Sequence, residues 1–168
     1  MGLSGQKIGV LGGGQLGTFL TIAAKQLGYQ VTVWDPDPAA PAHAWADTSI
    51  QIDFKNPAAL ETFIEKSHAV TYEWENIPIS LVAAIERERS VRPGSQILTL
   101  LQNRIKEKTV LRGHGFPVTP YLPILKKEAL KDAVEHLGFP LILKTATAGY
   151  DGLGQWRLTT MEDAADVL

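Results

Sequence analysis

Two glycine-rich segments, and the charged residues near them, are the parts of this sequence that could carry chemistry. The first, Gly12 to Gly17 (GGGQLG), matches the pattern G-x-G-x-x-G and follows the apolar run at residues 7–11. A glycine turn that leads from a strand into a helix presents backbone N–H groups and the positive end of the helix dipole, which attract an anion. Asp35 ends the next apolar run, where dinucleotide-binding domains carry the acid that binds a ribose.

This first segment allows three interpretations. It can bind NAD(P), it can bind another phosphate or nucleotide ligand, or its glycines can serve only a tight turn and close packing of helix against strand. Asp35 is followed by Pro36 and then by a second Asp-Pro pair, so it can equally be a turn residue. The motif alone favours a phosphate-containing ligand, of which NAD(P) is one candidate.

Two acidic residues, Glu73 and Glu75, follow a candidate strand in the segment TYEWENIP. Residues two apart in an extended segment point to the same side, and open α/β sheets bind ligands at the carboxyl ends of their strands. The carboxylates can bind ribose hydroxyls or an amine. The alternative is a solvated loop in which Trp74 is the only buried residue.

The second glycine-rich segment, residues 148–155 (AGYDGLGQ), follows Lys144 at the end of the apolar run LIL. Three glycines let backbone N–H groups fold around phosphate oxygens, and a lysine that closes a buried strand needs an anionic partner. Arg104 supplies a second cation, unless it lies on a solvated helix face. The segment lacks the ending of a Walker A loop, which disfavours a P-loop NTPase. We predict a nucleotide phosphate site, with a flexible hairpin tip as the alternative.

The elements that would position these residues alternate along the first half of the chain. Apolar, β-branched runs predict strands at residues 7–11, 30–34, 49–53 and 68–73. Helical spacing of apolar residues predicts helices at 15–27, 57–66 (with Asn56 as N-cap) and 78–87. Strands and helices that alternate with long connections predict an α/β fold with a doubly wound parallel sheet.

The pattern changes after a turn cluster at residues 92–95, so we predict two domains, 1–98 and 99–168. The second would contain a charged helix at 102–112, an edge or irregular strand at 117–124 and a helix at 126–137. A hairpin would follow, formed by a buried strand at 140–144 and its partner at 154–158, and then a helix capped by Thr159 or Thr160. A domain of about 70 residues built in this way is too small to close its own core, so we expect the sequence to be a fragment.

Composition and charge exclude several classes of function. Sixteen Lys plus Arg against eighteen Asp plus Glu give a net charge of -2, so no basic surplus favours nucleic acid or an anionic membrane. The absence of cysteine excludes a disulfide framework, a thiolate nucleophile and a thiolate metal site. No signal core or membrane span is visible at the N-terminus, and we expect a cytoplasmic protein.

Seven segments, taken in order, resemble the signature segments of the N5-carboxyaminoimidazole ribonucleotide synthetase family of ATP-grasp enzymes. They are GGGQLG, the DPDP turn with Pro41-Ala42 and Ala46-Asp47 after it, YEWENIP, QNRIKEK, GFPVTPY, LILKT and GYDGLGQ. The resemblance runs from about residue 7 to the end of the chain. It implies a Rossmann-like pre-ATP-grasp domain followed by the start of an ATP-grasp module, and it reassigns the first glycine turn to the substrate side.

The resemblance also implies an activity: ATP-dependent carboxylation of 5-aminoimidazole ribonucleotide with bicarbonate, through carboxyphosphate, in purine biosynthesis. Mg²⁺ and a homodimer are implied as well. The implied ATP-binding residues are Arg104, Lys144, Gly149, Tyr150, Asp151, Gly152, Leu153, Gly154 and Gln155, and Tyr150 and Asp151 are the catalytic candidates. The implied substrate-binding residues are Gly14, Gln15, Leu16, Glu73 and Glu75.

Two departures from the family pattern matter for activity. Leu153 stands where the family has Lys or Arg, which removes a cation from the loop. The family's Mg²⁺-binding carboxylates and adenine-binding residues lie beyond residue 168, so no metal ligand and no turnover are expected of this chain alone. Two other functions stay open as alternatives: an NAD(P)-dependent oxidoreductase, based on the first glycine turn, and a non-catalytic nucleotide-binding module.

Overall fold

The computed structural model describes residues 5–149 and 152–167, which belong to two compact units. The first unit ends at Thr99 and the second begins at Leu100. No helix among the described residues is long and apolar enough to cross a membrane.

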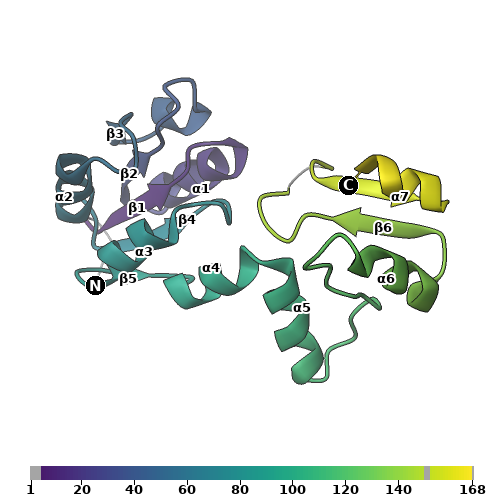
Figure 1. Cartoon of the computed structure of the whole chain (residues 1–168). Coiled ribbons are helices and arrows are strands. Elements are labelled where there is room, and N and C mark those ends of the chain that lie inside the picture. Colours follow the sequence, from purple (N-terminus) through teal and green to yellow (C-terminus); the bar gives the residue numbers. More distant parts are fainter. Residues whose placement is uncertain (1–4, 150–151, 168) are drawn as a thin grey trace. The chain divides into compact units, whose positions relative to one another are not determined.

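A five-stranded parallel sheet forms the first unit, in the order β3-β2-β1-β4-β5 (Figure 1). Its strands are β1 (Lys7–Leu11), β2 (Gln30–Trp34), β3 (Thr48–Ile50), β4 (Ala69–Tyr72) and β5 (Ser90–Val91). The chain builds outward from β1 to β3, then returns to the other side of β1 with β4 and β5. The predicted doubly wound α/β fold is therefore confirmed, and the order of strands reverses between β1 and β4.

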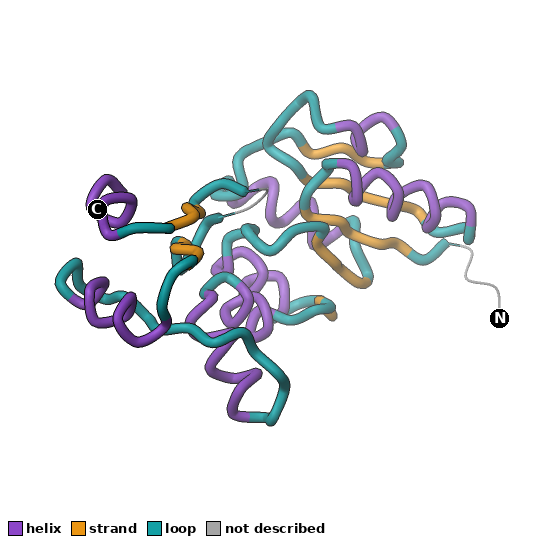
Figure 2. Tube along the Cα trace, turned by 90° about the vertical axis from the view of Figure 1, so that its right-hand side faces the viewer, coloured by secondary structure: helices purple, strands orange, loops and turns teal. Residues whose placement is uncertain are grey.

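Helices cover both faces of this sheet, whose strands lie side by side in Figure 2. They are α1 (Gln15–Gln26), the short 3-10 helix η1 (Pro41–Ala44), α2 (Pro57–Glu65), α3 (Ile79–Glu86) and α4 (Ser95–Leu101). Successive strand residues point to opposite faces. Val10 and Val33 thus belong to the core beneath α1 and η1, whereas Leu11 and Trp34 belong to the core with Phe63 of α2. All five side chains are fully or almost fully buried.

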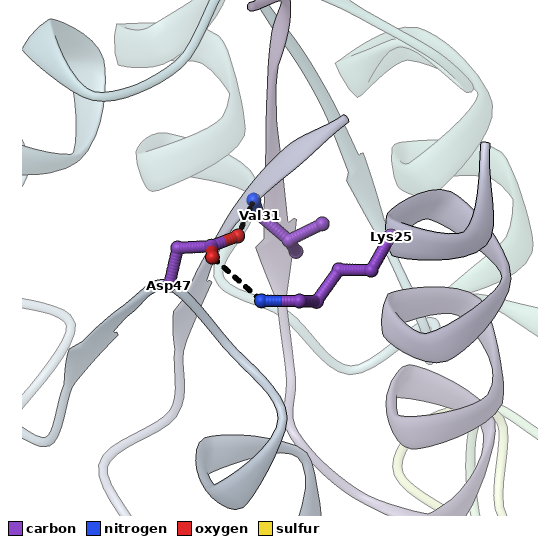
Figure 3. A network of polar contacts seen from close by, with 3 residues as sticks. All are labelled: Lys25, Val31 and Asp47. Atoms are coloured by element: carbon purple, nitrogen blue, oxygen red, sulfur yellow. Dashed lines mark hydrogen bonds and ion pairs between the residues drawn. The ribbon is translucent and has the colours of Figure 1, made fainter. Parts of the chain in front are cut away.

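Asp47 completes the sheet where β3 is too short to pair with all of β2 (Figure 3). Its backbone N–H donates to the Val31 carbonyl at 2.9 Å, and its carboxylate accepts the Val31 N–H at 2.8 Å. Lys25 Nζ lies 2.5 Å from the other carboxylate oxygen. Burial alone would raise the pKa of Asp47, but the hydrogen bonds from Lys25 and Val31 and the Lys25 charge outweigh it, and the pKa is lowered.

The second unit contains a two-stranded antiparallel sheet and three helices of its own. These elements are α5 (Arg104–Gly113), α6 (Ala129–Leu137), β6 (Leu141–Lys144), β7 (Gln155–Leu158) and α7 (Met161–Val167). The predicted hairpin is confirmed. The predicted strand at 117–124 is instead irregular throughout. Its three prolines lack the N–H that a strand needs for pairing.

The prediction that β6 is a buried strand is wrong. Leu141 and Leu143 pack on the core of the second unit with Leu158, but Ile142 is 56% exposed and Lys144 is exposed. The reason is that α6 and α7 supply core residues to one face of the ribbon only, among the described residues. Lys144 therefore lies on an open face and does not close a buried run.

Candidate functional site

The first candidate site lies where β1 and β4 end, at the reversal point of the sheet. Leu11 and Tyr72 are partners in the parallel pairing of these strands, so the glycine turn after Leu11 and Glu73 after Tyr72 are neighbours. The Glu73 backbone N–H donates to the Leu11 carbonyl at 3.0 Å, which fixes this arrangement. The sequence prediction that Glu73 lies at the carboxyl edge of the sheet is confirmed.

The Glu73 carboxylate caps helix α1. One oxygen accepts the Gly14 N–H at 2.7 Å, and the other accepts the Gly17 N–H at 2.6 Å. Gly14 is the N-cap of α1 and has no side chain that could serve these donors. A carboxylate from a distant strand end therefore does the work of a capping side chain, at the positive end of the helix dipole.

Asp35 also binds the glycine turn. One carboxylate oxygen accepts the Gly13 N–H at 2.7 Å and the other accepts the Asp37 N–H at 2.8 Å. Asp35 is therefore a turn residue, as one of the two interpretations held, and it is also a partner of the turn. Both of its oxygens are used within the protein.

These contacts correct one expectation from the sequence. The N–H groups of Gly13, Gly14 and Gly17 were expected to be free for a ligand anion, yet each donates to a protein carboxylate. Gln15 and Leu16, the next two candidates for substrate binding, are exposed in the first turn of α1. Glu75 is exposed beyond the end of β4.

Arg104 is the best-connected candidate residue of the second unit. It follows Asn103, whose side chain caps α5. The Asn103 Oδ1 atom accepts the N–H groups of Ile105 and Lys106, at 3.0 Å each. The guanidinium donates to the Thr145 carbonyl at 3.0 Å and to the Gly149 carbonyl at 2.5 Å, and the Arg104 N–H donates to Ala146 at 2.9 Å. The alternative that Arg104 lies on a solvated helix face is therefore wrong.

The glycine loop after β6 is narrow where it leaves the ribbon. The Thr145 N–H donates to the Gly154 carbonyl at 2.9 Å. A Cβ atom on Gly149 would lie 2.9 Å from Thr145 Oγ1, and one on Gly154 only 2.6 Å from it, so glycine is required at both ends. Gly152 and Leu153 are exposed between these ends.

Tyr150 and Asp151, the two catalytic candidates, lie outside the described residues. The remaining loop candidate, Gln155, pairs with Lys144 in the antiparallel register and is exposed. Lys144 and Gln155 therefore share one face of the ribbon, because residues directly opposite each other lie on the same side.

Sequence reasoning missed Arg157. It is the partner of Ile142, two residues after Gln155, so it lies on the same open face as Lys144 and Gln155. Its side chain is exposed, and within the described residues neither it nor Lys144 forms an ion pair. The period-two spacing from Gln155 was the available signal. The described residues contain no group of three or more acidic or histidine side chains that could hold a metal ion.

Comparison with known proteins gives the same order of domains. Residues 5–102 match the family model of the ribonucleotide synthetase pre-ATP-grasp domain, and residues 109–168 match the ATP-grasp domain. The N5-carboxyaminoimidazole ribonucleotide synthase of Bacillus subtilis is 38% identical over 167 residues, which are 98% of this chain and 44% of that protein.

Solved structures of N5-carboxyaminoimidazole ribonucleotide synthetases are similar to this chain as well. The ADP complex of an N5-carboxyaminoimidazole ribonucleotide synthetase superposes with a TM-score of 0.91 at 38% identity, over 98% of this chain and 44% of the other. The Aspergillus clavatus synthase, in complex with ADP and 5-aminoimidazole ribonucleotide, gives 0.87 at 30% identity, over 99% and 44%.

The chain thus spans less than half the length of the relatives it matches. The resemblance inferred from seven segments is confirmed, and the NAD(P) interpretation of the first glycine turn is left without support. The chain belongs to the ribonucleotide synthetase pre-ATP-grasp family, and its second unit is similar to the beginning of an ATP-grasp domain.

Proposed function

We propose that the complete protein carrying this chain is an ATP-grasp ligase that carboxylates 5-aminoimidazole ribonucleotide with bicarbonate while cleaving ATP. One observation carries the proposal. Arg104 donates to the carbonyls of Thr145 and Gly149, where the glycine loop leaves β6, and Lys144 lies on the open face of the adjoining hairpin. The likeness to N5-carboxyaminoimidazole ribonucleotide synthases over almost the whole chain supports the substrate assignment.

In this proposal the open ribbon face contacts the nucleotide phosphates. Lys144 and Arg157 contribute two cations, and Gln155 between them contributes amide donors, all on one side of the hairpin. Cations bind phosphate oxygens strongly, and positive charge stabilises a phosphoryl group during transfer. ATP, when bound, supplies the phosphoryl group that activates bicarbonate.

Arg104 has a different proposed role in the same site. Two of its N–H groups are used by the carbonyls of Thr145 and Gly149, so its main contribution is the geometry of the loop. Its remaining N–H donors and its charge would stay available to a phosphate bound beside Thr145 and Gly149. Leu153, which replaces the family's cation, is exposed and adds no charge. We propose that Arg157 offsets part of that loss.

The substrate side of the proposal uses the edge of the first sheet. Gln15 and Leu16 are exposed at the N-terminus of α1, and Glu73 and Glu75 follow β4 at the same edge. We propose that the ribonucleotide binds at this edge, in contact with these four residues and with Gly14, which are the residues predicted to bind it. Tyr150 and Asp151 remain the proposed catalytic residues.

The described residues offer no cluster of acidic or histidine side chains that could hold Mg²⁺. The family likeness supports further expectations for the complete protein: a need for Mg²⁺, a homodimer and a cytoplasmic location.

The test is ADP release by the complete gene product in a matrix of omitted substrates. We expect release only when ATP, bicarbonate and 5-aminoimidazole ribonucleotide are all present. Equal rates without bicarbonate or without the ribonucleotide would reject the activity. Tight ATP binding with no release under any condition would favour a non-catalytic nucleotide-binding module instead.

Two variants locate the ATP site in the same assay. Lys144→Ala and Arg157→Gln should each raise the KM for ATP about tenfold to a hundredfold, the loss expected for one charge-assisted hydrogen bond. The KM for the ribonucleotide should stay within about twofold. Lys126→Ala removes an exposed cation elsewhere in the second unit and is the matched control. An unchanged KM for ATP in Lys144→Ala removes Lys144 from the site.

A further inference from the structure

The glycine turn packs closely against one protein side chain, Glu73. A Cβ atom on Gly12 would lie 2.6 Å from Glu73 Cγ, and one on Gly14 would lie 2.6 Å from Glu73 Oε1. A Cβ atom on Gly17 would lie 2.7 Å from the Gly12 carbonyl oxygen and 3.1 Å from Glu73 Oε2. Gly12 and Gly14 therefore leave room for the Glu73 side chain, whereas Gly17 leaves room first for the Gly12 carbonyl and then for the Glu73 carboxylate.

In dinucleotide-binding domains the same motif lets the backbone approach a pyrophosphate, which lies at the helix N-terminus. In this protein the Glu73 carboxylate accepts the N–H groups of Gly14 and Gly17 at that place. Asp35 adds a second carboxylate on the neighbouring Gly13 N–H. Two formal negative charges thus lie against the turn before any ligand arrives.

The position of Glu73 is held by the fold. Its backbone follows β4, which is paired with β1, and its N–H donates to the Leu11 carbonyl. A tethered carboxylate loses little freedom when it binds the two amides, whereas a free anion must lose its translational freedom. A phosphate group would also have to displace Glu73 and lie close to Asp35, against like charge.

We propose that Glu73 is a specificity-determining residue, a built-in anion that excludes phosphate groups from the amides of Gly14 and Gly17. The turn therefore rejects pyrophosphate-bearing dinucleotides although its sequence matches their motif. Ligand groups at this edge meet a carboxylate and not a row of free amides. The inference does not depend on the proposed ligase activity, because it concerns the first unit alone.

The test is a titration of the protein with inorganic pyrophosphate, followed by the NMR signals of the Gly14 and Gly17 amides. These signals separate the turn from any pyrophosphate bound in the second unit. In the unmodified protein we expect neither amide to shift as pyrophosphate is added. In Glu73→Ala both should shift saturably, with half-saturation at a pyrophosphate concentration at least about tenfold below the highest concentration at which the unmodified protein shows no shift, because the charged competitor is removed.

Two further variants keep the result interpretable. Glu73→Gln preserves the size of the side chain and removes its charge, so its Gly14 and Gly17 amides should respond to pyrophosphate more weakly than those of Glu73→Ala. It replaces Glu73→Ala in the test if that variant fails to fold. Glu61→Ala removes one exposed negative charge from α2 and should behave as the unmodified protein, which controls for net charge. Saturable shifts of equal affinity in the unmodified protein would overturn the proposal. So would folded Glu73 variants whose Gly14 and Gly17 amides do not respond.

Discussion

Asp47 offers a sharp test of how the sheet is held together, because two different interactions meet on one carboxylate. It accepts the N–H of Val31, whose side chain is fully buried, and it pairs with Lys25, whose side chain is 36% exposed. Asp47→Ala leaves a backbone donor inside the sheet without a partner, which costs about 1–3 kcal/mol. The partly exposed ion pair is worth only about 0.2–1 kcal/mol.

The variants should therefore differ in how much they lower the free energy of unfolding. Asp47→Asn keeps an oxygen for the Val31 N–H and loses the charge, so we expect it to cost at most about 1 kcal/mol. Lys25→Ala removes the same ion pair from the other side and should cost a similar amount. Asp47→Ala should cost clearly more than either. The free energy of unfolding is measured by equilibrium urea denaturation, followed by tryptophan fluorescence, since Trp34 is buried in the same unit.

The stability that Asp47 contributes should decrease in acid. The pKa of Asp47 is lowered from its ordinary value of 3.8, so its contribution is fully present above pH 3.8 and is lost as the pH falls through the lower, folded-state value. The stability difference between the unmodified protein and Asp47→Asn should be constant near neutrality and should shrink in acid. Equal losses of stability in Asp47→Ala and Asp47→Asn, or a stability difference that grows in acid, would contradict these roles of the Asp47 carboxylate.

Three further predictions concern the two cores and the loop. Phe63→Ala should destabilise the first unit by about 3–5 kcal/mol, because its ring is fully buried, and urea denaturation measures this loss. Asn103→Ala should lower the stability of the second unit by about 1 kcal/mol through loss of the α5 cap, seen as an earlier calorimetric transition, and an unchanged transition would argue against the cap. Arg104→Lys should weaken ATP binding by the complete protein about tenfold, because one ammonium group replaces a planar guanidinium that donates to Thr145 and Gly149 together. Calorimetric titration measures this affinity, and an unaltered value would count against that role of Arg104.

Much of the first unit could be predicted from the sequence because its signals are local. The ranges predicted for β1 and β2 agree with the structure, since both are apolar runs closed by glycine or by Asp-Pro. Asn56 was predicted to cap α2, and its side chain accepts the Ala59 N–H at 3.0 Å. β5 was missed because two residues are too few for any periodic pattern.

The candidate site was harder to predict because its decisive contacts join distant residues. Glu73 and Gly14 are 59 positions apart, and Arg104 and Gly149 are 45 apart. A glycine motif indicates that something approaches the backbone closely, but it does not say whether a ligand or the protein's own carboxylate does so. Arg157 was missed for a similar reason: its spacing from Gln155 indicates that these two residues share a face, but only the register of the hairpin brings Lys144 onto that face.

The fate of labelled bicarbonate separates carboxylation of the ribonucleotide from ATP hydrolysis without carboxylation. The complete gene product is incubated with ATP, 5-aminoimidazole ribonucleotide and ¹³C-bicarbonate, and the carbon is followed by NMR while ADP is measured in parallel. The proposed function predicts that a ¹³C-carboxylated amine of the ribonucleotide appears in equal amount to ADP. ADP formed without any labelled carboxylated product would contradict it.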